Sequence, residues 1–398
     1  MVPALELGGG VPAVAAFALS ALRSSSFDFT LVSLSQSSSE ECSVRIADPR
    51  SLRRGVQVRQ GEWNGAPFFH VGAHLSEFEF QRYQPRPALT RLLATCDIVQ
   101  VVAGFPAWAN AVVGLGKPVS LHCATLARLE RRMRDSTGTG LLGQWRRMMT
   151  HVTDRMDLRA LKSVDAIQPM NKGLEEYVRE VNVGRDVDIR LAPPGIDADR
   201  FRPLDERAGE GYLLCVGRLD DPRKNVGMLV DVMAKLLPRR RLRLVLAGQA
   251  GPPQEFWDRA KAAGVDASID VFVNVSPPEL LSLYQRAAVF GLPSDEEGFG
   301  MVVLESMACG VPVVSTRSGG PDGIITDGED GFLVNRNDSD AFADQVERLL
   351  ESSELNHRIG RKARATVEAR YSERAAAAAF HEVWSRLLES AVPGRCAA

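Results

Sequence analysis

Two acidic side chains and several glycines lie together in the second half of the chain. Residues 293–300 read PSDEEGFG; they follow a strand-like run and precede a helical pattern over 301–309. Glu297 falls in the loop and Glu305 about one turn into the helix. Glycines let a ligand approach the backbone closely, and a helix N-terminus offers N–H groups to an anion. Carboxylates beside such a turn accept hydrogen bonds from hydroxyls, so the pattern indicates a phosphate next to sugar hydroxyls. The alternative is that Glu297 is only a charge at a helix N-terminus and Glu305 lies on a solvated face.

Two cations follow an earlier strand-like run. Residues 212–218 read YLLCVGR, so the strand is expected to end at Gly217, and Arg218 and Lys224 flank the turn into the next helix. Fixed cations at the carboxyl end of a parallel strand suit a diphosphate. They could stabilise a departing nucleotide diphosphate in place of a metal. The alternative is that Lys224 is an ordinary surface residue.

Two features of the first half could contribute to the same chemistry. Gly8, Gly9 and Gly10 precede a helix expected from about Pro12, which is a second turn suited to an anion. His122 ends a strand-like run at 118–121, at the edge of an α/β sheet where ligands bind. A packed or surface histidine is the alternative. No His/Cys group in the sequence has the spacing of a zinc site, so no metal is expected.

The order of the elements predicts the fold class. Strand-like runs alternate with helical patterns, which is typical of α/β proteins with parallel sheets buried on both faces. The expected strands are residues 31–34, 98–102, 118–121, 166–167, 212–216, 242–247, 268–273, 289–293 and 311–315. A segment rich in Pro, Gly and charge, 191–211, separates two halves. We therefore expect domains at 1–190 and 191–370, followed by a helical segment at 371–398.

Composition excludes several classes of protein. The 398 residues include 48 Lys+Arg and 50 Asp+Glu, a formal net charge of −2, whereas nucleic-acid binders are usually basic. No apolar run reaches the roughly 18 residues of a membrane span. Glycines, not basic residues, precede the apolar run 11–22, so a signal peptide is not expected. Six cysteines without a CxxC indicate reduced thiols, and we expect a cytoplasmic protein that binds no nucleic acid.

One basic segment raises the question of membrane contact. Residues 128–159 contain eight Arg against four acidic residues. The segment also contains the apolar residues Leu141, Leu142, Trp145, Met148 and Met149. A basic amphipathic surface could contact anionic lipid or an anionic acceptor. A helix with its apolar face on the core and a solvated basic face is the favoured interpretation.

Four blocks of sequence resemble the family-4 retaining glycosyltransferases. They are EGFGMVVLESMACGVPVVSTRSGG at 297–320, CVGRLDDPRKN at 215–225, APPGIDADRF at 192–201 and DGEDGFLV at 327–334. The resemblance implies the GT-B fold: two Rossmann-like domains facing across a cleft, with the final helix crossing back to the first domain. Val273 and Asn225 depart from the pattern, because the family usually has glycine at both positions.

The resemblance also assigns roles to individual residues. It implies that Arg218 and Lys224 hold the donor diphosphate, that Glu297 binds hydroxyls of the transferred sugar, and that His122 lies over that sugar. Glu305 would bind the ribose, Val275 would offer its backbone to the base, and the glycines would let the backbone reach the donor. The donor-binding set is Gly9, Gly10, Gly217, Val275, Gly298, Phe299, Gly300, Met301 and Glu305.

The expected activity is retaining hexosyl transfer from a nucleotide diphosphate sugar, with UDP favoured by family frequency and no metal cofactor. The favoured acceptor is a hydroxyl of a small polar molecule, such as an aminocyclitol or amino-sugar intermediate of natural-product biosynthesis, whose amines Glu77 and Glu79 could bind. An alternative is a lipid-linked or cell-envelope acceptor. Two further alternatives are a sugar-nucleotide epimerase and a non-catalytic subunit that binds a nucleotide sugar.

Overall fold

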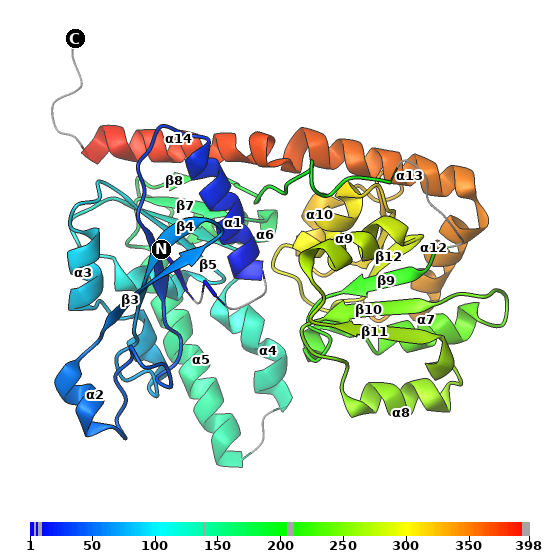
Figure 1. Ribbon diagram of the computed structural model, residues 1–398, viewed down its shortest axis with the longest axis horizontal. Helices are drawn as coiled ribbons and strands as arrows, with labels where there is room; N and C mark the ends of the chain where they lie inside the picture. Colours follow the sequence, from blue (N-terminus) through cyan, green and yellow to red (C-terminus); the bar gives the residue numbers. More distant parts are fainter. Residues whose placement is uncertain (4, 7–9, 138–139, 205–210, 392–398) are drawn as a thin grey trace, which may run out of the picture. The chain divides into compact units, whose positions relative to one another are not determined.

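The chain divides into two α/β units, each with its own sheets. The computed structural model describes residues 1–391 except 4, 7–9, 138–139 and 205–210 (Figure 1). Unit 1 comprises Met1–Pro194 together with the chain from Ala376 onward, and unit 2 is Gly195–Ala375. The first division therefore falls within the Pro- and Gly-rich segment at 191–211, and the second falls five residues after the expected start of the final segment.

Unit 2 is built on a six-stranded parallel sheet with the order β11-β10-β9-β12-β13-β14. Its strands are β9 (Leu213–Val216), β10 (Leu244–Gly248), β11 (Ile269–Val273), β12 (Val289–Leu292), β13 (Val313–Thr316) and β14 (Phe332–Val334). Successive strands run outward from β9 in one direction and from β12 in the other. The strand order therefore reverses between β9 and β12, and ligands bind outside the carboxyl ends of the strands at such a point.

Helices connect the strands of unit 2 and cover its sheet. They are α7 (Met228–Leu236), α8 (Gln254–Ala262), α9 (Pro277–Arg286), α10 (Met301–Ala308), α11 (Gly320–Ile324), α12 (Ser339–Glu351) and α13 (Ser353–Thr366). The central strands β9, β12 and β13 are fully buried and mostly apolar, as parallel strands covered on both faces require. Local signals fix several helix starts: Ser276 and Glu279 form a capping box at α9, and the Asp338 side chain caps α12.

Unit 1 contains two four-stranded sheets, β1-β2-β4-β3 and β5-β6-β7-β8. The strands are β1 (Val2–Pro3), β2 (Leu31–Leu34), β3 (Val58–Trp63), β4 (Ala66–Val71), β5 (Val99–Ala103), β6 (Val119–Cys123), β7 (Ala166–Pro169) and β8 (Asp188–Ile189). The Met1 ammonium donates to the carbonyl of Gln100, and the amide of Val102 donates to the carbonyl of Met1. The short β1 therefore lies between β2 and β5 and joins the two sheets.

The helices of unit 1 include one from the far end of the chain. They are α1 (Gly10–Arg23), α2 (Pro49–Arg54), α3 (Pro87–Leu93), α4 (Ala127–Thr137), α5 (Gly140–Leu161), α6 (Lys172–Val181) and, from Ala376 onward, α14 (Glu373–Ala391). The Phe380 ring of α14 meets the Phe17 ring of α1 edge to face at 5.2 Å, and Trp384 packs on Phe27. The expected return of the final helix to the first unit is confirmed, as is the α/β class with parallel sheets.

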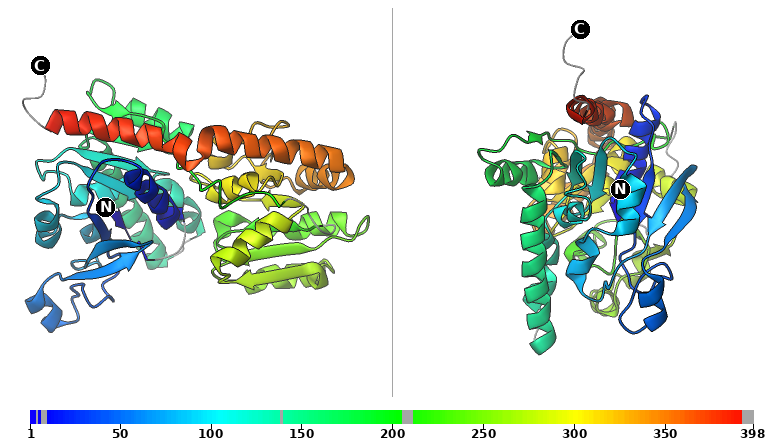
Figure 2. Two further views of the ribbon diagram at one scale, coloured as in Figure 1. Left: turned by 45° about the horizontal axis from the view of Figure 1, so that its top comes forward. Right: turned by 90° about the vertical axis from the view of Figure 1, so that its left-hand side faces the viewer.

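Two features differ from the sequence predictions. The antiparallel hairpin β3–β4, joined at Asn64 and Gly65, was not predicted. The apolar residues at the start of α5 were expected on the core, but Leu141 and Trp145 are exposed. The right-hand view of Figure 2 shows α5 extending well beyond the sheets of unit 1, so its first turns have no sheet beneath them. No helix in the described part of the chain is long and apolar enough to cross a membrane.

Candidate functional site

A lysine and a glutamate meet at the carboxyl ends of β9 and β12. The Nζ atom of Lys224 lies 2.5 Å from Oε1 of Glu297, and the two side chains are only 15% and 9% exposed. The hydroxyl of Ser294 donates to the same Oε1 atom at 3.0 Å. The pair lies where the strand order reverses, so the structure brings together two of the residues that the sequence singled out.

The loop after β9 holds the cations in place. Asp221 caps the short 3₁₀ helix Pro222–Lys224, and its carboxylate also pairs with Arg223 at 2.8 Å and with Arg218 at 3.1 Å. Burial would raise the pKa of Asp221, but the hydrogen bonds and charge of Arg223, with the charge of Arg218, hold it below its usual value. Asp221 is therefore ionised and orients Arg218, whose side chain stays half exposed and available to an anion.

Hydrogen bonds join this loop to the one after β12. The Asp295 amide donates to the Arg223 carbonyl at 2.8 Å, and the Asn225 side chain donates to the Asp295 carboxylate at 3.3 Å. Asn225 has φ of +45°, a left-handed conformation that Asn adopts more readily than most residues other than Gly. The structure therefore explains how Asn225 replaces the glycine usual in the family.

The loop from Glu297 to Gly300 is fixed from the opposite side by the chain after β13. The Glu297 amide donates to Ser318, and the Gly320 amide donates back to Glu297. A Cβ atom on Gly320 would lie 2.1 Å from the Phe299 carbonyl oxygen, so only glycine fits there. Gly300 has φ of +100° and immediately precedes α10, which begins at Met301. The Val303 amide donates to the Gly300 carbonyl at 2.9 Å, whereas the amides of Met301 and Val302 come before any carbonyl partner that the helix could supply.

Glu305 lies one turn into α10, in a buried setting. The Tyr284 hydroxyl donates to its Oε2 atom at 2.6 Å. Burial raises the pKa of Glu305 above its usual value, although the Tyr284 hydrogen bond and the charge of Arg200 oppose the shift. Tyr284 had no signal in the sequence beyond its place in an apolar helical pattern.

The remaining donor-binding candidates of unit 2 lie at the same edge of its sheet. Gly217 directly follows β9, and its amide donates to Ala247 of β10. Val275 is half buried and follows β11 by two residues, next to Asn274, whose amide donates to Gly248 of β10. Val273 ends β11 with an exposed side chain. The sheet therefore places the strand-end candidates of this unit along one edge.

The candidates of unit 1 have different surroundings. Gly9 lies outside the described residues, whereas Gly10 is the exposed first residue of α1. His122 is fully buried, its Nε2 atom lies 2.8 Å from the Ala192 carbonyl, and its ring meets Phe380 edge to face at 4.8 Å. Burial lowers the pKa of His122 to about 4. These are the surroundings of a packed, neutral histidine, and its role over a donor sugar stays a prediction.

Glu77 and Glu79 already have partners within unit 1. The Glu79 carboxylate forms an ion pair with Arg131 and accepts a hydrogen bond from the Tyr83 hydroxyl. The Glu77 carboxylate accepts from the Ile46 amide at 3.1 Å. The structure therefore gives no support to these carboxylates as the binding site for acceptor amines.

One group of side chains in the described part of the chain has the composition of a metal site. The ligating atoms of Glu40, Cys42 and His70 all lie within 4.8 Å of one another. His70 Nε2 is hydrogen-bonded to Glu40 at 2.6 Å and its Nδ1 to Ser33 at 3.0 Å. These hydrogen bonds join His70 of β4 to Ser33 of β2 and to Glu40, so they hold the loop after β2 in place without a metal. It belongs to unit 1, whereas Lys224 and Glu297 belong to unit 2.

The segment that carries the Lys224–Glu297 pair matches a known family model, described as glycosyl transferases group 1, over residues 197–366. The match covers less than half of the chain, and over this segment the chain is similar to the glycosyl transferases of group 1. The glycosyltransferase segment contains Arg218, Lys224, Glu297 and Glu305, together with the loops that position them.

Curated relatives of the glycosyltransferase segment share a name. D-Inositol 3-phosphate glycosyltransferase of Corynebacterium jeikeium is 29% identical over 259 residues, which is 59% of this chain and 59% of that protein. D-Inositol 3-phosphate glycosyltransferase 2 of Catenulispora acidiphila is 35% identical over 222 residues, 50% of this chain and 51% of that protein. The chain thus spans between half and three fifths of the length of these relatives.

Solved structures extend the likeness to the whole chain. Sucrose-phosphate synthase from Thermosynechococcus elongatus has a TM-score of 0.68 at 18% identity and covers 96% of this chain and 94% of its own. A glycosyltransferase from Rickettsia africae has a TM-score of 0.65 at 18% identity, with 98% and 97% covered. At this identity the likeness shows the fold, and the expected GT-B fold class is confirmed.

Proposed function

We propose that this protein transfers a sugar from a nucleotide diphosphate sugar to an acceptor hydroxyl, with retention at the anomeric carbon. The observation that carries the proposal is the contact between Lys224 and Glu297 at the point where the strand order reverses. Without a ligand, the lysine and the glutamate neutralise each other. A nucleotide sugar bound at this point would break their ion pair, because its diphosphate would bind the cation and its sugar hydroxyls would bind the carboxylate. The diphosphate takes the lysine, and the sugar hydroxyls take the glutamate.

The proposed step uses the cations to stabilise the leaving group. The acceptor oxygen bonds to the anomeric carbon on the face from which the diphosphate departs. The bond from that carbon to the diphosphate oxygen breaks, its electron pair stays on that oxygen, and the acceptor proton moves to the same diphosphate. Lys224 and Arg218 offset the charge that develops, with the N-terminus of α10 nearby. This role for side-chain cations is the reason to propose transfer without a divalent metal.

Glu297 and Glu305 differ in their proposed roles. Lys224 leaves Glu297 when the diphosphate binds, so Glu297 becomes free to accept hydrogen bonds from the transferred sugar. Glu305 keeps its bond to Tyr284 and binds the ribose with its other oxygen. His122 has no proposed part in the chemistry, because it is buried and held by Ala192 and Phe380.

The relatives suggest which substrates to test first. Two curated relatives carry D-inositol 3-phosphate in their names, which supports a phosphorylated cyclitol as the first acceptor alongside aminocyclitols and amino sugars. The HepE protein of Anabaena, with a TM-score of 0.62, was solved with UDP-glucose, and UDP-glucose is accordingly the first donor.

Product analysis tests the proposal. The purified protein is incubated with UDP-glucose, with inositol 3-phosphate or buffer, and in the presence of EDTA. We expect UDP release only when acceptor is present, and an α-linked product by proton NMR. Conversion of the donor without acceptor would favour an epimerase. Donor binding without turnover, whether the acceptor is inositol 3-phosphate, an aminocyclitol or an amino sugar, would favour the non-catalytic subunit.

A further inference from the structure

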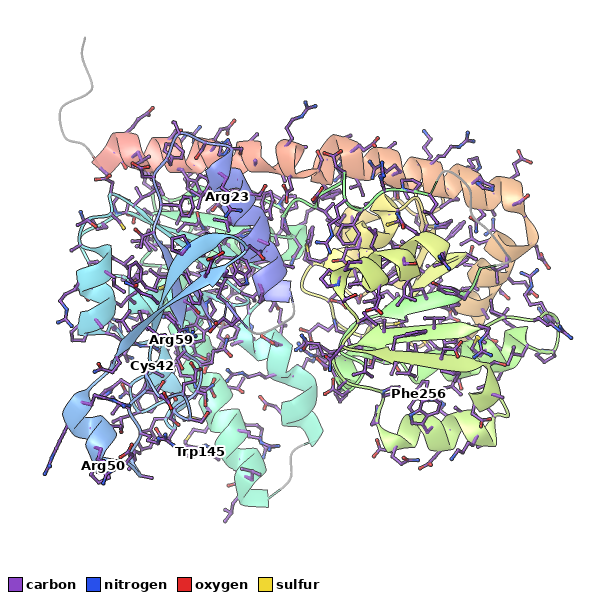
Figure 3. The ribbon with its side chains drawn as sticks, in the orientation of Figure 1. Arg23, Cys42, Arg50, Arg59, Trp145 and Phe256 are labelled. Carbon is purple, nitrogen blue, oxygen red and sulfur yellow. The ribbon has the colours of Figure 1, made fainter. Side chains whose placement is uncertain are left out.

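Three side chains of unit 1 with different ligating atoms meet between the loop after β2 and strand β4. They are Glu40 and Cys42 of the loop and His70 of β4, whose ligating atoms all lie within 4.8 Å of one another. Figure 3 labels Cys42. Cys42 and His70 are 28 positions apart, which is why the spacing of Cys and His predicted no zinc site. The fold brings them together, because β2 and β4 pair with Ser33 opposite His70.

The His70 ring is held as the ring of a metal-binding histidine usually is. It is 4% exposed, its Nδ1 atom lies 3.0 Å from the Ser33 hydroxyl, and its Nε2 atom faces Glu40 at 2.6 Å. A ligating histidine normally bonds an oxygen with its other ring nitrogen, which fixes the ring and its tautomer. A hydroxyl can accept as well as donate, so Ser33 can hold an N–H at Nδ1 while Nε2 binds a metal.

A second serine orients the Glu40 carboxylate. The Oε1 atom of Glu40 accepts a hydrogen bond from the Ser35 hydroxyl at 2.7 Å, which leaves Oε2 directed at His70. Ser35 is fully buried, whereas the Glu40 side chain is 39% exposed. The group is therefore anchored from the inside and open to solvent, so an ion can enter and water can supply a further ligand.

Cys42 is fixed by the close approach of its backbone to the end of β4. A Cβ atom on Gly72 would lie 1.8 Å from the Cys42 carbonyl oxygen, so only glycine fits at position 72. The same oxygen accepts a hydrogen bond from the Gln57 amide at 3.0 Å. Main-chain contacts therefore hold Cys42 next to β4, whether or not its sulfur has a ligand.

We propose that Glu40, Cys42 and His70 bind a zinc ion, with water as the fourth ligand. Thiolate, imidazole and carboxylate are the protein ligands that zinc takes, and magnesium and calcium prefer oxygen ligands alone. Ligand atoms around a tetrahedral zinc lie about 3.3–3.7 Å apart, so shifts of about 1 Å complete the site. The ion replaces the hydrogen bond between His70 and Glu40, and the imidazole proton moves from Nε2 to Nδ1.

The state of the thiol limits how tightly zinc binds. Burial and the charge of Glu40 raise the pKa of the Cys42 thiol, so the sulfur is protonated at neutral pH when no metal is bound. Zinc binding releases that proton to solvent, and the thiolate and the carboxylate then balance the two charges of the ion. We expect a Kd on the order of 1 µM, weaker than that of structural sites with four protein ligands.

Bound zinc would join the loop after β2 to β4, and so stabilise unit 1, without a part in sugar transfer. The three ligands belong to unit 1, whereas Lys224 and Glu297 belong to unit 2. Zinc binding is measured without donor or acceptor, and sugar transfer is measured in EDTA. The two proposals can therefore fail separately.

Titration of the full chain with zinc chloride, after dialysis against EDTA and then chelator-free buffer, is the test. We expect one zinc per chain by calorimetry, and a rise in Tm of about 5 °C at 100 times the Kd. Cys42→Ser and Glu40→Gln should each abolish that rise. Ser33→Ala keeps all three ligands and should weaken binding roughly tenfold. Cobalt chloride should give the absorption band of a cobalt–thiolate bond with the wild type and none with Cys42→Ser.

Matched controls separate this site from zinc binding by other Cys and His side chains. Cys96→Ser removes another partly buried thiol of unit 1, and His74→Gln removes an exposed histidine four residues after His70. Both should bind zinc like the wild type. Cys42→Ser is a small change beside fixed backbone, so its Tm without zinc should stay close to that of the wild type.

Three results would overturn the proposal. The first is a folded wild type that shows no saturable zinc binding. The second is a Cys42→Ser variant that binds zinc as the wild type does and keeps the cobalt band. The third is loss of binding in Cys96→Ser or His74→Gln but not in Cys42→Ser, which would place the zinc elsewhere.

Discussion

Lys224 and Glu297 form a nearly buried ion pair between residues 73 positions apart, at 2.5 Å, across the two strands where the sheet of unit 2 reverses its order. Each residue holds the other in place in the absence of ligand. Removing one partner should therefore lower the free energy of unfolding, because it leaves the other charge with little access to water.

The ion pair predicts a specific pattern in a double-mutant cycle. Lys224→Met should lower the free energy of unfolding by about 3 kcal/mol, because it leaves the Glu297 carboxylate without its cation. Adding Glu297→Gln should restore most of that loss. Urea unfolding of the four proteins measures the coupling energy, and a coupling energy near zero would mean that the contact contributes nothing to stability.

Arg218 should matter to turnover and little to stability. Its side chain is half exposed, and losing its contact with Asp221 should change the free energy of unfolding by about 0.5 kcal/mol or less. Arg218→Ala should lower kcat by roughly 100-fold if Arg218 stabilises the leaving diphosphate. Arg241→Ala, at an exposed position of the same unit, is the matched control and should keep wild-type kcat.

Glu305 should lower the stability of the protein at neutral pH and at the same time be required for donor binding. Its raised pKa means that the folded state holds a proton more tightly than the unfolded chain does. Stability therefore falls as pH rises from the unfolded value through the folded one. Glu305→Gln keeps an acceptor for Tyr284, so it should remove this slope and raise Tm at neutral pH. Glu305→Gln should also abolish the increase in Tm that UDP causes in the wild type. If UDP raised the Tm of the variant as much as that of the wild type, Glu305 would be excluded from the nucleotide site.

His122 should govern stability at mildly acidic pH. Its pKa near 4 lies below the unfolded value of about 6.5, so protons bind the unfolded chain more tightly. Stability should fall as pH drops from about 6.5 to 4, by up to about 3 kcal/mol for this group. His122→Gln should flatten that part of the profile and retain turnover near pH 7. A loss of turnover without a change in the pH profile would instead favour the donor-sugar role.

Gly320 should be irreplaceable even by alanine. The added Cβ would lie 2.1 Å from the Phe299 carbonyl and push away the loop that carries Glu297. Gly320→Ala should cost about 1–3 kcal/mol and reduce turnover. Gly323→Ala, three residues on in the same short helix, meets nothing within 4 Å and should be nearly neutral.

Much of unit 2 could be predicted because its signals are local. The expected strands 212–216, 268–273 and 289–293 agree with β9, β11 and β12 to within a residue or two at each end. Short apolar runs bounded by Gly, Pro or charge are strong signals for buried parallel strands. The hairpin β3–β4 of unit 1 could also have been predicted from its sequence, because Asn64-Gly65 is the preferred pair for such a turn. In the structure both residues have the positive φ that the turn requires.

Contacts between distant residues could not be predicted in the same way. The sequence motifs assigned a diphosphate to Lys224 and sugar hydroxyls to Glu297 as ligands. They did not indicate that these two side chains form an ion pair with each other when no ligand is bound. The partners of Arg218 and Glu305, namely Asp221 and Tyr284, were likewise missed. The Asp221-Pro222 pair is a local signal for a helix start and could have been found. The exposure of Leu141 depends on how far α5 extends past the sheet, which periodicity does not encode.

The most direct test of the central claim compares acceptor-dependent UDP release by the wild type and by Lys224→Met, both in EDTA. The account predicts that the wild type turns over in the chelator, that Lys224→Met is slower by roughly 100- to 1000-fold, and that UDP-glucose consumption without acceptor is negligible. Turnover that requires added magnesium, or that survives Lys224→Met at the wild-type rate, would contradict it.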